Sequence, residues 1–133
     1  MKIIRFIAGF VGVYHIASGL LGTLSGNLAA ELGRILFNAR VDVTPQFSYM
    51  AKYLGAYVIA FGAMMLFIAQ DPVKYRGLIN VAVLLICIRI IDRIVFAAEL
   101  KNAFGIELTQ SIVTISIIGL VGLSLLIFKP KVG

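Results

Sequence analysis

Long apolar runs alternate with short polar segments along the chain. The runs cover residues 3–24, 49–70, 77–98 and 108–128. Each has about the 20 residues that an α-helix needs to cross the hydrocarbon core of a bilayer. The pattern predicts an all-α fold, in which residues 1–133 form a single transmembrane domain built as an integral-membrane four-helix bundle.

One connection, residues 25–47, is long enough to hold an element of its own. Apolar residues recur there at helical spacing, opposite polar ones: Leu28, Leu32, Ile35 and Leu36 against Glu31, Arg34 and Asn38. This pattern predicts a short amphipathic helix on the outer membrane surface.

The other boundaries carry turn and cap residues. Thr44 and Pro45 predict the N-cap and first turn of the second membrane helix. Asp71 and Pro72 predict a tight turn before the third, and Gly105 predicts that helix's end.

The composition is that of a membrane protein. Hydrophobic residues make up 61% of the chain and charged residues 14%, against about 25% charged residues in a soluble domain. The mean hydropathy is +1.04. The net charge of +6 does not indicate nucleic-acid binding, because the chain has no platform of alternating aromatic and basic residues.

Basic residues instead flank the apolar runs unequally. With four membrane crossings, one side carries a single acid, Asp71, among six basic residues: Lys2, Arg5, Lys74, Arg76, Lys129 and Lys131. The positive-inside rule then places both termini in the cytoplasm, in a protein of the cytoplasmic membrane. We expect the first run to be a retained helix, because no small-x-small cleavage motif follows it closely.

Small residues predict where helices pack closely. One face of the first run carries Ala8, Gly12, Gly19, Gly22 and Gly26, interrupted by His15. In the second run, Gly55 and Gly62 belong to a repeat, G-x-Y-x-I-A-x-G, found at residues 12–19 and 55–62. Two alternatives stay open for this repeat. It reflects an old duplication, or it is a chance match, because apolar helices draw on few residue types.

The third run is apolar but contains Arg89, Asp92, Arg93 and Glu99. A charge at the bilayer centre costs about 2.5–3.5 kcal/mol on insertion scales, so such residues face a protein interior or a wet cavity. Two interpretations stay open. The residues form an internal ion network around Asp92, or the two arginines hold an anionic or polar ligand through their planar guanidinium groups.

His15 and Tyr57 complete the candidate site. His15, at mid-depth, is either a hydrogen-bonded packing residue, a contact to Arg89 or a bound molecule, or the single axial ligand of a tetrapyrrole, which is the least favoured. Tyr57 is expected to form a hydrogen bond inside the bundle. By depth and facing, the ligand-binding candidates line one outward-facing pocket: His15, Tyr57, Arg89, Asp92, Arg93 and Glu99.

Catalysis is the least supported class of function. The chain has one cysteine, Cys87, and one histidine, too few for a zinc site built from these residues. No nucleophile–base pair or suitably spaced carboxylate pair is visible. We therefore predict no catalytic residue and no metal ligand.

The segment Tyr53–Gly62, which reads YLGAYVIAFG, and the segment RIIDR at residues 89–93 resemble the small BphX-like membrane proteins. With the long first loop, they also resemble the wider DoxX-like group. The resemblance implies a four-helix bundle and assigns no catalytic residue. The oxidative and aromatic-degradation pathways linked to such families suggest a lipophilic small molecule or a redox complex as context.

Three functions follow from these observations. The leading one is binding of an amphiphilic or anionic small molecule, such as a lipid head group or a quinone, in an outward-facing intramembrane pocket. The second is a non-catalytic accessory subunit of a larger membrane redox complex. The third is a small dimeric transporter. The expected partners are membrane lipids, together with a second copy of the chain or a larger membrane complex, and no nucleic acid.

Overall fold

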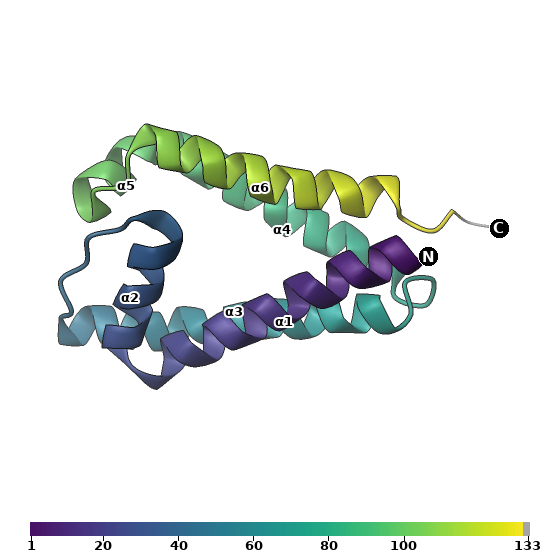
Figure 1. Ribbon diagram of the computed structural model, residues 1–133, viewed down its shortest axis with the longest axis horizontal. Coiled ribbons are helices and arrows are strands. Elements are labelled where there is room, and N and C mark those ends of the chain that lie inside the picture. Colours follow the sequence, from purple (N-terminus) through teal and green to yellow (C-terminus); the bar gives the residue numbers. More distant parts are fainter. Residues whose placement is uncertain (132–133) are drawn as a thin grey trace.

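The computed structural model describes residues 1–131, which fold into α-helices joined by short connections (Figure 1). In chain order the helices are α1 (Lys2–Leu24), α2 (Gly26–Phe37), α3 (Pro45–Gln70), α4 (Arg76–Val95), α5 (Ala97–Phe104) and α6 (Leu108–Ile127). The all-α class is confirmed. Helices α1, α3, α4 and α6 lie near the four apolar runs, and α2 lies where the amphipathic helix was predicted.

Two of the predicted caps are present in atomic detail. The Thr44 hydroxyl accepts a hydrogen bond from the Phe47 N–H at 3.1 Å, and Pro45 begins α3. Gly105, with a positive φ of 64°, ends a helix as predicted, but that helix is α5. Asp71 accepts hydrogen bonds from the Val73 and Lys74 N–H groups in the turn before α4.

The third apolar run is divided, which the sequence did not predict. Helix α4 ends at Val95, and a non-helical residue, Phe96, redirects the chain into α5. Helix α5 thereby reaches the segment that follows α2, where the Arg40 N–H donates to the Phe104 carbonyl at 2.7 Å. This contact between distant segments explains why apolar content alone placed the helix end too late.

Three of the helices, α1, α3 and α6, are long and apolar enough to cross a membrane. Their outward faces carry large exposed hydrophobic side chains such as Phe6, Leu24 and Ile127. Helix α4 has the length of a membrane helix but contains Arg89, Asp92 and Arg93 within its last two turns.

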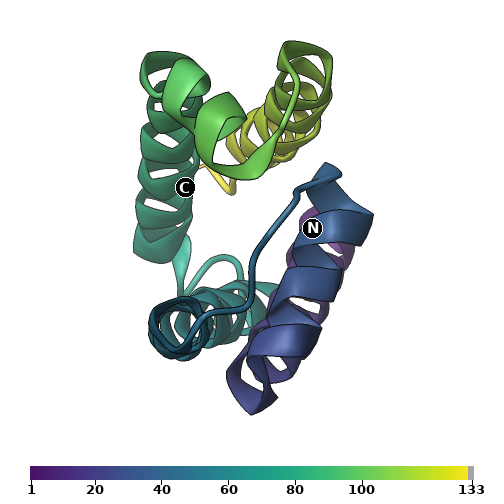
Figure 2. The same ribbon diagram turned by 90° about the vertical axis from the view of Figure 1, so that its left-hand side faces the viewer.

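The predicted four-helix bundle is not confirmed, because the long helices associate as two pairs. Helix α1 packs chiefly against α3, and α4 packs chiefly against α6. The pairs meet at the end that holds both termini and diverge toward α2 and α5 (Figure 1). Viewed from the diverging end, α4 and α6 lie on one side and α1 and α3 on the other (Figure 2). Buried residues close the converging end: Ile4, Met65, Ile68, Ile79 and Leu125.

Glycines set the distance between α1 and α3. A Cβ atom added to Gly12 would lie 2.9 Å from the Gly62 carbonyl oxygen, and one added to Gly62 would lie 2.7 Å from the Gly12 oxygen. Gly19 and Gly55 face each other in the same way, at 2.9 and 2.8 Å. The two copies of G-x-Y-x-I-A-x-G therefore pack antiparallel against one another, each copy's first glycine against the other copy's last.

The predicted packing stripe is not uniform in its contacts. Ala8 is fully buried, and a Cβ atom on Gly26 would overlap Ser48 of α3. Gly22 differs, since a Cβ atom added there would meet no atom of residues 1–131 within 4 Å apart from the neighbouring backbone of its own helix. Close approach in the middle of α1 is therefore restricted to Gly12 and Gly19.

Candidate functional site

A cavity of about 340 Å³ lies where the two helix pairs diverge. Its walls come from α1, α2, α3, α4 and α6. Helix α6 contributes one continuous face: Gln110, Val113, Thr114, Ile117, Ile118 and Val121. These positions recur every three or four residues and follow the helix for about 16 Å, at 1.5 Å per residue. We call this space the main cavity.

The polar groups of the main cavity gather at its outer half, the half nearer α2. On α6 they are Gln110 and Thr114, which precede the apolar Ile117 and Val121 along a helix that runs toward the converging end. On α1 the order is reversed, because this helix runs away from the converging end: apolar Phe10 and Val11 come first, then Tyr14 and His15. Helix α4 adds Ile86 and then Arg89 in the same order. The cavity is therefore amphipathic along its length.

Helix α2 covers the outer end of the main cavity. Its last residues, Leu36 and Phe37, are part of the wall, and α2 then ends at Asn38 in a left-handed conformation with φ 53°. The Gln110 side chain donates from Nε2 to the Leu36 carbonyl at 3.1 Å. This hydrogen bond attaches α2 to α6 across the space between the helix pairs.

Loss of this attachment should loosen α2. We expect Gln110→Leu to speed amide hydrogen exchange over residues 34–44 by about fivefold, since a typical net hydrogen bond contributes about 1 kcal/mol. The control is Gln70→Leu at the far end of α3, which should leave exchange in this segment unchanged. Equal exchange rates in Gln110→Leu and the unaltered protein would show that α2 is held by other contacts.

A second, smaller cavity of about 210 Å³ adjoins the outer half of α4. Its wall is formed by Arg89, Asp92, Arg93, Phe96 and Leu100. Arg89 lines both cavities. One guanidinium group is therefore shared between the apolar space along α6 and the charged recess beside α5.

The arginines of α4 have no acidic partner within residues 1–131. The ion pairs found there join Arg34 to Glu31 and Lys101 to Glu107, all with exposed side chains. Asp92 pairs with neither Arg89 nor Arg93. The ion network, one of the two interpretations left open by the sequence, is therefore not formed within residues 1–131.

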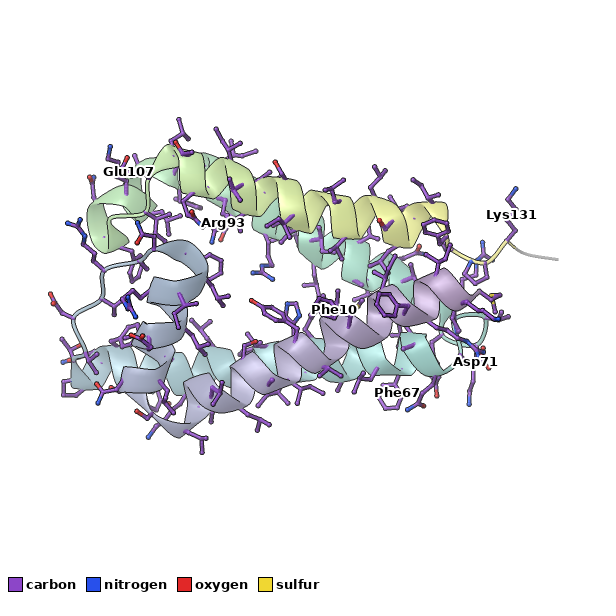
Figure 3. All side chains as sticks on the ribbon, viewed as in Figure 1. Phe10, Phe67, Asp71, Arg93, Glu107 and Lys131 are labelled. Carbon is purple, nitrogen blue, oxygen red and sulfur yellow. The ribbon has the colours of Figure 1, made fainter. Side chains whose placement is uncertain are left out.

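Arg93 is held by an aromatic ring instead of a carboxylate. Its guanidinium carbon lies 4.8 Å from the centroid of the Phe37 ring of α2, within the range of a cation–π interaction. Figure 3 shows the Arg93 side chain directed toward α2. One of its terminal nitrogens, Nη1, is buried and has no hydrogen-bond partner among the described residues. A buried, unpaired donor on a cation is a favourable place for an anion.

Helix α2 carries a conventional surface ion pair for comparison. Arg34 donates two hydrogen bonds to Glu31 one turn earlier. The bond from Arg34 lowers the pKa of Glu31, and the carboxylate raises the pKa of Arg34. Because both groups are fully exposed, this pair contributes little to stability.

His15 makes one hydrogen bond within its own helix. Its Nδ1 lies 2.7 Å from the Val11 carbonyl oxygen, and its ring packs against Phe61 of α3 at 4.8 Å between centroids. A carbonyl oxygen only accepts hydrogen bonds, so we assign the proton to Nδ1. In the neutral imidazole, Nε2 then remains free as an acceptor for a group in the main cavity.

The chain matches no protein-family model, no curated protein and no solved structure. The geometry of the two cavities is therefore the basis for a functional assignment.

The structure separates the candidate residues into two groups. His15 and Arg89 meet in the main cavity, and Arg89 joins Asp92 and Arg93 in the second. Tyr57 and Glu99 line neither cavity. This outcome corrects the prediction that all six candidates share one pocket.

The two exclusions have geometric causes. Tyr57 is two residues from Gly55, about 200° around the helix from the face that meets α1. Its hydroxyl bonds Tyr53 at 3.1 Å on the exposed surface, not inside the bundle. Glu99 follows the turn at Phe96, so it lies on α5 and no longer shares the α4 face. Leu100 takes the place in the wall that Glu99 was expected to occupy.

Sequence reasoning missed three residues of the main cavity, Gln110, Thr114 and Phe37. Gln110 and Thr114 are one turn apart at the start of α6, a spacing that indicates a shared polar face. Phe37 had no such signal, because its role depends on where α2 comes to lie.

Proposed function

We propose that this protein is a small multi-pass membrane protein that binds an amphiphilic or anionic small molecule in the space between its helix pairs. The observation that carries this proposal is the main cavity, which is apolar along most of its length and has Arg89 in its polar half. Arg93 lines the adjoining second cavity. Neither arginine has an acidic partner in residues 1–131. The candidate ligands are a lipid head group or a quinone.

A membrane setting explains both the outer surface and the charged helix. Helices α1, α3 and α6 present apolar side chains outward. We take α4 as a fourth crossing, because its charged residues line cavities, as intramembrane charges require. We also propose membership of the BphX-like and DoxX-like group, supported by the segments at residues 53–62 and 89–93.

Ligand binding is tested by thermal unfolding of the purified protein in nanodiscs. We use two probes, a sodium alkyl carboxylate and a short-chain benzoquinone. A ligand that binds only the folded state stabilises it by about 2.7 kcal/mol at a concentration one hundred times its Kd. We expect at least one probe to raise the unfolding temperature in a saturable way. A flat response to both would refute the proposed pocket.

The proposed orientation places both termini in the cytoplasm. Asp71 and Lys131 lie at one end of the molecule and Glu107 at the other (Figure 3). The end with Asp71 also holds the start of α1, the turn between α3 and α4, and the segment after α6, which carry the basic residues Lys2, Arg5, Lys74, Arg76, Lys129 and Lys131. Reporter fusions after residue 131 and within residues 38–44 should report opposite sides of the membrane, with the C-terminal fusion cytoplasmic. A C-terminal reporter outside the cytoplasm would reverse the direction in which the cavities open.

A further inference from the structure

The shape of the main cavity limits what it can hold. Its volume of about 340 Å³ is at the lower end of the range of roughly 300–1,000 Å³ for small-molecule sites. The space nevertheless follows α6 from Gln110 to Val121, about 16 Å at the helical rise. A long, narrow space of this volume suits one alkyl chain and is too small for the two acyl chains of a phospholipid.

The order of the wall residues fixes the orientation of such a chain. The inner part of the cavity is apolar on three helices, with Phe10 on α1, Ile86 on α4 and Val121 on α6. The outer part holds His15, Arg89 and Gln110. A tail therefore belongs at the inner end, and a polar head belongs under α2.

The charge of the walls selects the head group. Across both cavities the charged residues are Arg89, Asp92 and Arg93, which leaves one positive charge in excess when His15 is neutral. Arg93 lines the second cavity together with Arg89, and its buried Nη1 has no hydrogen-bond partner among residues 1–131, so it adds an unpaired donor. A neutral quinone leaves this charge uncompensated, whereas a head group with one negative charge neutralises it and accepts hydrogen bonds from both guanidinium groups.

From shape, orientation and charge together, we infer that the ligand is a single-chain amphiphile with an anionic carboxylate or phosphate head. The head lies between Arg89 and Arg93 beneath α2, and the tail extends along α6 to Val121. This inference rests on the proposed binding function and narrows it to one class of molecule.

The test measures how binding affinity depends on the length of the alkyl chain. The protein in phosphatidylcholine nanodiscs is titrated with alkyl carboxylates and monoalkyl phosphates of increasing chain length. An alkyl trimethylammonium and the two-chain anionic lipid phosphatidylglycerol serve as comparison probes. Binding is followed by the unfolding temperature. We expect saturable binding of the single-chain anions and none of the cation. Comparison of the affinities for alkyl carboxylates and monoalkyl phosphates shows which head group the site prefers.

Two variants of α6 test where the tail lies. Val121→Phe fills the inner end of the cavity and should weaken binding of the longest probes by about tenfold while leaving the shortest unchanged. The matched control is Leu120→Phe, because Leu120 is 64% exposed on the outward face; this variant should bind like the unaltered protein. The two substitutions add the same ring at adjacent positions.

The outcomes separate this inference from the function on which it rests. The inferred single-chain anionic ligand would be wrong if phosphatidylglycerol or the cationic probe bound as well as the single-chain anions. It would also be wrong if the Val121→Phe variant still bound the longest probes with unchanged affinity. In each of these cases the proposed ligand pocket stands. Failure of every amphiphile to bind would overturn the inference, and the proposed pocket would fall with it only if the benzoquinone also failed to bind.

Discussion

We expect Gly62→Ala to lower the unfolding free energy by about 1–3 kcal/mol, the usual cost of overpacking a tight interface, and Gly62→Leu to prevent assembly of the helix pair. The added Cβ atom would lie 2.7 Å from the Gly12 carbonyl oxygen and 2.9 Å from the Ile16 nitrogen. Both are backbone atoms, which cannot rotate out of the way. The α1–α3 pair would have to separate, and the wall of the main cavity formed by these helices would be lost with it.

The control for this prediction is a glycine of α1 that makes no close contact with α3. Gly22→Ala adds the same methyl group where no other described helix has an atom within 4 Å. Since alanine favours a helix over glycine by about 1 kcal/mol, this variant should be neutral or slightly stabilised. Thermal unfolding in a single detergent compares the two. Equal unfolding temperatures for Gly62→Ala and Gly22→Ala would contradict the glycine contact between α1 and α3.

Removal of the charge at Arg93 should separate binding from stability. We expect Arg93→Gln to weaken binding of an anionic amphiphile by at least tenfold, because a hydrogen bond to a charged group contributes about 1.5–3 kcal/mol. Without ligand, the same variant should unfold at an equal or higher temperature. The reason is that the substitution removes a cation whose buried nitrogen has no partner in the described chain. If Arg93 served only to hold the helices together, Arg93→Gln would instead lower the unfolding temperature and leave ligand binding unchanged.

Arg34→Gln is the matched control for Arg93→Gln. It removes one positive charge from the same end of the molecule, but Arg34 is exposed, pairs with Glu31 and lines neither cavity. Titration with the same amphiphile should give the affinity of the unaltered protein. If both variants lose affinity equally, the arginines act through their general field and not through a site.

Local signals in the sequence were sufficient for the helices and several of their ends. Apolar run length located α1, α3, α4 and α6 to within a few residues, and the Thr44–Pro45 cap was predicted because capping depends on neighbouring residues. The turn at Phe96 was not predictable in this way, since α5 is positioned by a contact with Arg40 far away in the chain.

In the candidate site, too, features set by neighbouring residues were predictable and features set by distant contacts were not. Arg89 and His15 were identifiable because a charge and an imidazole in apolar runs are costly unless they face a cavity. The contact from Gln110 to Leu36 joins residues 74 positions apart, and no periodicity in one helix predicts it. The repeat at residues 12–19 and 55–62 gave a packing motif without its partner, because either copy has the spacing to pack against many apolar helices.

The most direct test of the ligand-binding account is native mass spectrometry of the protein after gentle extraction from its membrane. We expect the unaltered protein and Arg34→Gln to carry one small anionic molecule of a single mass class. Arg89→Gln and Arg93→Gln should lose this molecule while remaining folded. Unaltered protein without any bound molecule, or the same adduct on all four proteins, would contradict a binding site built around Arg89 and Arg93.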